Sequence, residues 1–458
     1  MFKLTCSFYC PPRAEKIAIY MLNLIASVTG IRFRRVNGQA DIVYGGVSNS
    51  NSFYIPYREM DKRFVHGDID SWYLHEDGEL RIALPKSIKK INIHNNEIDF
   101  DIFSVMFNFL QTALSVHNKH LEFFRKFKND DIFIPPVFDD YISYFLQVLK
   151  SCQKLPNDFK RKSPWPEEAD FALGISHDID IFKRKIPGSV AMLMKSLFSN
   201  EVPGGVRGSL KGLFKSVSTA LTGETNPYSA IEKWFDIESE NTFFIHAGVR
   251  RSVEDPTYDP EDIRRVLVGL GMDGIEIGLH NSIGSWTDKE DLKEQKDRLM
   301  NIFNTEIEGI RPHYLDCRYP DYWRNAESFK YSSSVGSDAI AGFTCGINFP
   351  FFGFDFDTAN VLDILEIPIG LMDCALFSIC EKTSKEKTID KLIDICVSNH
   401  GLLVLDWHTR TVYEPDFPGW FDTYCMILKK AKSAGAFIAP LGKISSYWKN
   451  HCTSFFLS

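Results

Sequence analysis

Short apolar segments that each end in polar, chemically reactive residues constrain this 458-residue chain more than any other feature. Between them lie helical patterns, in which apolar residues recur at the i, i+3, i+4, i+7 spacing. Alternating strands and helices predict parallel strands with helices outside, and such folds collect their sites at the strands' carboxyl ends. We therefore expect an α/β fold with one site at that end. The segments are residues 171–180, 241–248, 274–282, 309–315 and 401–408.

The first segment places two carboxylates two residues apart, because Asp178 and Asp180 follow the apolar run 171–175. Side chains at i and i+2 of a strand share a face, so both acids should converge on one small volume. A bound metal or a proton would relieve their repulsion. A strand followed by an acidic turn is the plainer interpretation of an isolated pair, and the polar ends of the later segments favour a site.

These segments carry motifs that resemble the polysaccharide deacetylases of the NodB-homology type, a carbohydrate esterase 4-like family. The motifs are Ser-His-Asp-Ile-Asp at 176–180, Gly-Leu-His ending at His280, Gly-Ile-Arg ending at Arg311, and Leu-Asp-Trp-His ending at His408. Residues 164–166, 309–315, 366–368 and 371–373 further resemble a bacterial subgroup that has an extra N-terminal domain of unknown function. The resemblance implies a distorted (β/α) barrel of the NodB type with a smaller N-terminal α/β domain.

The activity that this resemblance implies is metal-dependent removal of an acetyl group from a polysaccharide or glycan precursor, with an N-acetyl group as the preferred candidate. A divalent cation, zinc or similar, polarises the carbonyl, a carboxylate takes a proton from water, and an imidazole protonates the leaving amine. Asp373 is our candidate to hold the imidazole of His408 in its useful tautomer. The resemblance otherwise assigns Asp178 as the base, Asp180 and His280 as metal ligands, Arg311 as the group that orients Asp178, and His408 as the acid.

The chain departs from the family where the second motif normally has another histidine, because that position is Gly284. Asp180 and His280 alone fall one short of the three protein ligands of a catalytic zinc site. We favour His313 as the third ligand, since it lies two residues from Arg311 and would share its face on a strand. His177 is one step out of phase with both aspartates and would face away. The alternatives considered for the third ligand are His177, Ser282 and Asn281.

A second departure is Thr344, which stands where the subgroup tends to carry arginine. The two departures leave open a catalytically impaired barrel that binds a saccharide or a biosynthetic partner. Aromatic faces suit the apolar faces of sugar rings. The candidate substrate-binding residues are Trp323, Tyr322 and His177.

The first third of the chain reads as a separate unit. Strand patterns at 41–46, 53–55 and 80–84 and helical patterns at 103–114 and 141–149 predict a small α/β domain. We expect an N-terminal domain of unknown function at 1–135, a helical connector at 136–164 and the deacetylase-like barrel at 165–450.

Composition bounds the partners. A net charge of −8 argues against nucleic-acid binding. The sequence has no glycine-rich phosphate loop that would indicate a nucleotide cofactor. No segment is long and apolar enough to span a bilayer, and the N-terminus does not fit a secretory signal. Ten scattered cysteines suit a reducing compartment. We therefore expect a cytoplasmic protein, whose substrate is an activated or lipid-linked saccharide.

A long insertion at about 183–225 follows the first motif. It carries seven lysines and arginines against the single acid Glu201 until Glu224, and a Gly-Gly pair at 204–205. A basic flap over the pocket would suit a diphosphate or an anionic lipid, and the amphipathic character of the segment leaves a peripheral membrane contact open. A solvated insertion with no binding role is the alternative.

Overall fold

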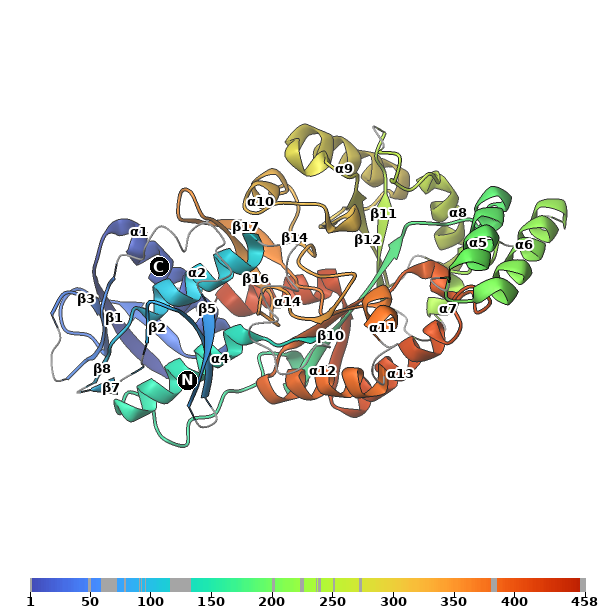
Figure 1. The fold of residues 1–458 in the computed structure, drawn as a ribbon. Helices are drawn as coiled ribbons and strands as arrows, with labels where there is room; N and C mark the ends of the chain where they lie inside the picture. Colours follow the sequence, from blue (N-terminus) through green and yellow to red (C-terminus); the bar gives the residue numbers. More distant parts are fainter. Residues whose placement is uncertain are drawn as a thin grey trace.

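A computed structural model shows the arrangement of the chain (Figure 1). Glu201 and Glu224 of the basic insertion lie outside the described residues. The structure describes residues 2–47, 51–58, 72–77, 80–89, 91, 93–94, 96–115, 133–199, 202–222, 226–235, 237, 240–249, 252–271, 274–379 and 385–453.

The N-terminal part contains a six-stranded sheet in the order β2-β1-β3-β4-β8-β7. Its strands pair in parallel except for the β7–β8 hairpin, and helices α1 and α2 pack against each other. The predicted α/β organisation of this region is confirmed, whereas the boundaries at 135 and 164 stay a prediction. Its elements are β1 (Lys3–Tyr9), α1 (Pro12–Thr29), β2 (Arg32–Arg35), β3 (Ile42–Gly45), β4 (Phe53–Ile55), β5 (Trp72–Asp77), β6 (Leu80–Pro85), β7 (Ile93–His94), β8 (Glu97–Ile98), α2 (Ile102–Ser115), β9 (Phe133–Ile134) and α4 (Val137–Ser151).

The second sheet is a curled, open barrel of ten strands in the order β16-β17-β14-β13-β12-β11-β10-β19-β18, with β20 also paired to β10. All of its pairings are parallel except β16–β17, so the expected distorted barrel is confirmed. Its strands are β10 (Phe171–Ile179), β11 (Asn241–His246), β12 (Ile275–Asn281), β13 (Gly309–Pro312), β14 (Tyr331–Ser332), β16 (Phe351–Asp355), β17 (Asn360–Glu366), β18 (Leu371–Met372), β19 (Leu402–Asp406) and β20 (Ala436–Pro440).

Helices flank this sheet where the apolar periodicity predicts them. Helix α9 ends at Phe303, the last buried residue of its apolar stripe. Asp288 caps the start of α9, since its carboxylate accepts the backbone N–H groups of Glu290 and Asp291. The helices are α5 (Ile186–Phe198), α6 (Gly205–Thr222), α7 (Glu232–Phe235), α8 (Pro260–Leu270), α9 (Lys289–Phe303), α10 (Asp321–Asn325), α11 (Asp373–Ile379), α12 (Lys385–Asn399), α13 (Trp420–Ser433) and α14 (Leu441–Thr453), with short 3₁₀ turns η4 (Pro166–Glu168), η5 (Pro227–Ser229), η6 (Ser285–Thr287), η7 (His313–Leu315) and η8 (Thr409–Val412).

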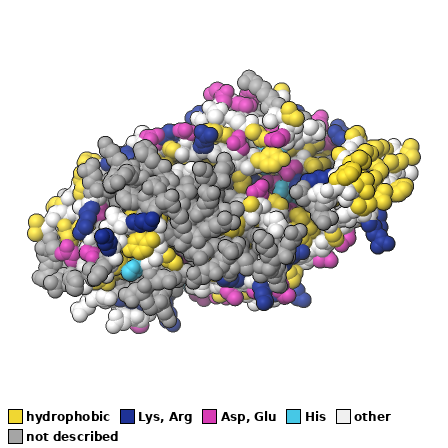
Figure 2. Space-filling view, in the orientation of Figure 1, with side chains coloured by type: hydrophobic (Ala, Val, Ile, Leu, Met, Phe, Trp, Pro, Cys, Tyr) yellow, Lys and Arg dark blue, Asp and Glu magenta, His cyan; other side chains and the backbone are white. Residues whose placement is uncertain are grey.

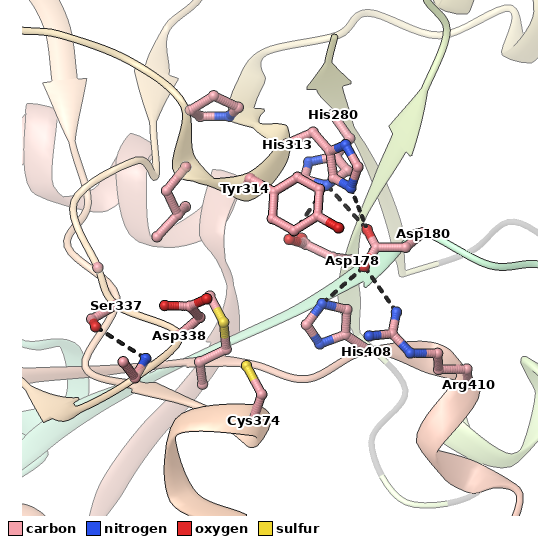
Figure 3. Close-up of a pocket in the computed structure, with 15 residues that line it drawn as sticks. Asp178, Asp180, His280, His313, Tyr314, Ser337, Asp338, Cys374, His408 and Arg410 are labelled. Carbon is pink, nitrogen blue, oxygen red and sulfur yellow. Dashed lines mark hydrogen bonds and ion pairs between the residues drawn. The ribbon is translucent and has the colours of Figure 1, made fainter. Parts of the chain in front are cut away.

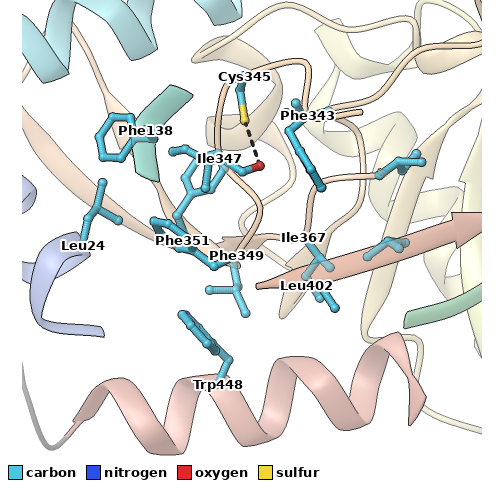
Figure 4. Packing of buried hydrophobic residues seen from close by; sticks show 14 of the residues in the cluster. Leu24, Phe138, Phe343, Cys345, Ile347, Phe349, Phe351, Ile367, Leu402 and Trp448 are labelled. Carbon is cyan, nitrogen blue, oxygen red and sulfur yellow. Dashed lines mark hydrogen bonds between the residues drawn. The ribbon is translucent and has the colours of Figure 1, made fainter. Parts of the chain in front are cut away.

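The two sheets share one hydrophobic core. Leu24 of α1 and Phe138 of α4 approach Phe351 of the barrel, and Trp448 of α14 closes the cluster from below (Figure 4). The short strand β9 also pairs in parallel with β15 (Ala341–Gly342). The Tyr20 hydroxyl of α1 donates to the Phe352 carbonyl of β16 at 2.6 Å, so a hydrogen bond adds to the apolar contact between the N-terminal part and the barrel.

Candidate active site

Strand β10 brings the two aspartates to the barrel's open end. Residues Phe171 to Ile179 are all buried, because the strand pairs with β19 and β20 along its first half and with β11 along its second. Asp178 and Asp180 line one pocket, as their spacing predicts. The cavity measures about 330 Å³. Its other walls come from His280, Pro312, His313, Tyr314, Leu315, Gly336, Ser337, Asp338, Ala339, Met372, Cys374, His408 and Arg410.

Three side chains in this pocket form a group that could hold a metal ion. Asp180 Oδ1 lies 3.3 Å from His280 Nε2 and 3.6 Å from His313 Nε2, and the three ligand atoms are all within 4.8 Å of one another (Figure 3). His313 therefore lies where it could serve as the third ligand. Its route differs from the expectation, because β13 ends at Pro312 and His313 opens the turn η7.

His280 and His313 are each oriented by a hydrogen-bond partner at Nδ1, on the side of the ring away from Asp180. His280 Nδ1 donates to the Arg311 carbonyl at 3.0 Å, so in the neutral ring it is Nε2, on the pocket side, that carries the lone pair. His313 Nδ1 faces Asp255 Oδ1 at 3.3 Å, a carboxylate partner of the kind that orients metal-bound imidazoles. Burial and the nearby His280 ring lower the pKa of His313, which favours the neutral ring that a metal needs.

The donor set fits a cation. Within the described part of the chain, Asp180 Oδ1 and His280 Nε2 are buried polar atoms without a hydrogen-bond partner. Such atoms are costly unless something satisfies them, and a divalent ion with oxygen and nitrogen ligands would do so. Burial lowers the pKa of His280, but Asp178 and Asp180 outweigh it and raise that pKa, so the surroundings favour positive charge.

Asp178 is held by Arg311 rather than by the metal group. Arg311 Nη1 donates to Asp178 Oδ1 at 2.8 Å, while its Nη2 donates to the Ser176 and Ser333 hydroxyls, both at 2.9 Å. Burial raises the pKa of Asp178, yet Arg311 together with the nearby His280 and His408 rings outweighs burial and holds that pKa below its usual range. Asp178 is therefore ionised at neutral pH and able to accept a proton.

His408 occupies the opposite side of the pocket. Its Nδ1 faces Asp373 Oδ1 at 2.9 Å, and Asp373 Oδ2 accepts the His408 backbone N–H at 2.8 Å. His408 Nε2 lies 3.1 Å from Asp180 Oδ2. Burial lowers the pKa of His408, but Asp373 and Asp180 outweigh it and raise the pKa well above its usual range. The ring is therefore protonated at neutral pH and carries its second proton toward the pocket.

Sequence reasoning missed three residues of this site. Arg410 Nη1 donates to Asp180 Oδ2 at 2.8 Å, Asp255 backs His313, and Asp406 Oδ1 lies 3.1 Å from Arg311 Nη1. Asp406 and Arg410 each lie two residues from His408, so the last motif's own spacing could have indicated them. Asp255 gives no such signal, because it lies in a loop nine residues after β11 ends.

The three predicted substrate-binding residues do not reach the pocket. Trp323 and Tyr322 are fully buried, and the Trp323 indole donates to Glu366 Oε2 at 2.9 Å. His177 is also buried and faces away from the aspartates, with Nδ1 2.8 Å from the Trp407 carbonyl and Nε2 3.1 Å from Asn241 Oδ1. A side chain with no exposed face cannot stack on a sugar, so the expectation is corrected for all three.

The two departures from the motif pattern also have positions in the structure. Gly284 has a φ of 77° and precedes η6, and its N–H donates to Asp316 Oδ2 at 2.8 Å. Of the other candidate ligands, the Ser282 backbone N–H donates to Gln295 Oε1 and Asn281 Nδ2 donates to the Ser285 hydroxyl, and neither residue is among those that line the pocket. Thr344 is buried and is not among the residues that line the pocket.

Comparison with known proteins gives structural neighbours only. No protein-family model matches the sequence, and no curated protein matches it. Puue allantoinase is 17% identical with a TM-score of 0.40, covering 64% of this chain and 95% of that one. A probable polysaccharide deacetylase from Pseudomonas aeruginosa PAO1 is 14% identical with a TM-score of 0.43 over 64% and 95% of the two chains. A putative polysaccharide deacetylase from Mycobacterium smegmatis is 14% identical with a TM-score of 0.38 over 62% and 92%.

Proposed function

We propose that this protein is a metal-dependent hydrolase that removes an acetyl group from a saccharide or glycan precursor, with an N-acetyl group as the preferred candidate. The observation that carries the proposal is the group Asp180, His280 and His313, flanked by an ionised carboxylate on one side and a protonated imidazole on the other. The carboxylate is Asp178 and the imidazole is His408. Hydrolysis of an amide needs one group that accepts a proton from water and another that donates a proton to the leaving amine, and these two side chains can fill those roles.

Each residue has a task that follows from its partners. When bound by Asp180, His280 and His313, a divalent cation such as zinc would supply the positive charge that polarises an acyl carbonyl. Asp178, fixed by Arg311, accepts a proton from the attacking water. His408 Nε2 donates a proton to the leaving amine, and Asp373 holds the ring so that this nitrogen faces the pocket.

A second candidate function is saccharide binding without hydrolysis. Arg410 favours it, because its guanidinium donates to Asp180 Oδ2 at 2.8 Å, and Asp180 Oδ1 is the oxygen that faces His280 and His313. A fixed positive charge so close to a ligand carboxylate weakens the attraction of that carboxylate for a cation. The cytoplasmic location and the division into domains remain proposals of the sequence.

Titration calorimetry with zinc and cobalt separates the two functions. Chelator-treated wild type is compared with Asp180→Ala and His313→Ala, and His400→Asn serves as a histidine control outside the pocket. One-to-one binding that both pocket variants lose and the control keeps supports the metal site. Acetate release from N- and O-acetylated oligosaccharides by the metal-loaded protein then tests hydrolysis. Saccharide binding with neither metal binding nor acetate release would favour the second function.

A further inference from the structure

Helices α5 and α6, which we call the hairpin, expose large apolar side chains. Phe198 is 84% exposed, Phe214 is 74% exposed and Leu221 is 81% exposed. Figure 2 shows hydrophobic side chains gathered over both helices at the right-hand end of the molecule. Apart from the adjacent Leu197 and Phe198, they recur within each helix at intervals of three or four residues and form one stripe on each helix. The exposed apolar residues are Ile186, Val190, Met194, Leu197, Phe198, Val206, Leu210, Phe214, Val217 and Leu221.

The side of α6 that faces the protein carries small residues instead. Gly208 and Gly212 are buried, as is Ser216, and they recur every four residues opposite the apolar stripe. A side chain at Gly208 would collide with the Pro415 carbonyl, and one at Gly212 would collide with Arg184. A helix at the surface of a globular protein normally buries its apolar face, so this pattern is inverted. The large residues of the hairpin therefore do not stabilise this chain's own core.

The hairpin is nonetheless firmly seated. Arg184 Nε donates to Asp416 Oδ2 at 2.6 Å and Arg184 Nη2 to Asp416 Oδ1 at 3.1 Å, and both side chains are buried. Ser189 of α5 and Ser216 of α6 lie 2.7 Å apart at their hydroxyl oxygens, and Arg184 donates to both. These contacts seat the hairpin with its apolar stripes outward, and Asp416 lies shortly after the turn η8 that bears Arg410.

Charge identifies what covers the stripes. Arg207, Lys211 and Lys215 each follow an apolar residue of the α6 stripe, and this four-residue repeat lines one flank of it. Residues 183–222 carry seven lysines and arginines against one acid in a chain whose net charge is −8, and of these seven Arg184 is buried in its pair with Asp416 and Lys183 is paired with Asp262. A second copy would bring like charges together across the contact. An apolar face bordered by cations instead matches the interface of a bilayer that contains anionic lipids.

We propose that the hairpin docks this protein onto an anionic lipid surface, with the apolar stripes of α5 and α6 inserted at the headgroup level. No helix of the described residues is long and apolar enough to cross a membrane, so the contact is peripheral. The proposal is independent of the proposed hydrolysis, since none of the hairpin residues lines the pocket.

Vesicle co-sedimentation of the full chain tests this docking. The probes are vesicles of phosphatidylcholine alone and of phosphatidylcholine mixed with phosphatidylglycerol. Wild type should bind the mixed vesicles, and the double variant Phe198→Ser, Phe214→Ser should bind them at least about tenfold more weakly. Arg207→Gln and Lys211→Gln should each weaken binding about fivefold, and added salt should weaken wild type further.

The matched control is the double variant Val47→Ser, Val253→Ser, which removes apolar residues that are 87% and 100% exposed elsewhere on the surface. It should bind vesicles like wild type. Circular dichroism and zinc titration check that each variant is folded with its pocket intact. Absent vesicle binding, equal loss in the control, or a concentration-dependent dimer that the hairpin variants abolish without any lipid binding would each overturn the proposal.

Discussion

Arg311 pairs with Asp178 in the pocket, and Arg184 pairs with Asp416 at the base of the hairpin. Both pairs are buried, but they differ in how completely the aspartate is satisfied. Both oxygens of Asp416 are bonded by Arg184, and the Tyr228 hydroxyl adds a bond of 2.6 Å. Asp178 uses only Oδ1 for Arg311, while its Oδ2 lies 3.7 Å from His280 Nε2 on the pocket side.

The difference separates a structural pair from a chemical one. A buried carboxylate whose two oxygens are both hydrogen-bonded fixes two elements to each other and has little affinity left for a new partner. A carboxylate held at one oxygen is positioned and keeps the other for a proton. The same residue types at similar burial therefore serve folding in one place and, in our proposal, catalysis in the other.

The largest effect on function should come from Asp178→Asn. The amide cannot accept the proton of the attacking water, so turnover should fall by roughly 10²- to 10⁴-fold. The amide oxygen can still accept from Arg311, which preserves the fold. Initial rates of acetate release measure the change, and thermal unfolding and zinc titration of the same sample serve as controls. A variant that keeps the wild-type rate would remove Asp178 from the mechanism.

Asp255→Asn should act on the metal instead of on the proton transfer. The amide keeps the volume but loses the charge that faces His313 Nδ1, so zinc affinity should fall roughly 10- to 100-fold. Asp255 also accepts the Ser252 and Ile283 N–H groups, which the variant retains only in part. Calorimetric titration gives the affinity, and the matched control is Asp316→Asn, an aspartate that accepts the Gly284 N–H next to Ile283. Equal losses in both variants would indicate a general loop defect.

Asp416→Ala tests the structural pair. It leaves the Arg184 guanidinium buried without its partner, so the free energy of unfolding should fall by about 3–5 kcal/mol. Zinc affinity of the fraction that remains folded should stay at the wild-type value. Urea unfolding and calorimetry below the transition measure the two quantities. An unchanged unfolding midpoint would mean that the hairpin is not seated through this pair.

The barrel could be predicted from the sequence because two periodicities alternate along it, and the five polar strand ends lie where parallel strands place them. The pair Asp178 and Asp180 and the residues His280, Arg311 and His408 meet for the same reason. His313 reached the site although its strand ends one residue earlier, since the turn η7 turns its ring inward. That local bend is not encoded in the two-residue spacing from which it was predicted.

What could not be predicted depends on burial and on contacts between distant segments. Trp323 follows the third motif closely, yet the helix α10 turns it into the core, where Glu366 is its partner. Asp255 lies in an irregular loop, and no periodicity indicates where such a loop folds back. The inverted pattern of α6 was also hidden, because an apolar stripe in a sequence predicts a buried face by default.

The smallest effect on the site should come from His177→Gln, which sharpens the contrast with Asp178 one residue later on β10. Burial lowers the pKa of His177 from 6.5 to about 4, with its bonds to Trp407 and Asn241 opposing the shift. Between these values the unfolded chain binds a proton that the folded chain does not, so stability falls as the pH drops through this range. The penalty reaches roughly 3 kcal/mol at the acid end of this range.

Glutamine does not titrate, so the unfolding free energy of His177→Gln should depend less on pH in this range. Urea unfolding of metal-free protein across this range measures the slopes, and zinc affinity at neutral pH should match wild type. Equal slopes in both proteins would show that this ring is protonated in the folded state, contrary to its burial on the face of β10 that points away from the pocket.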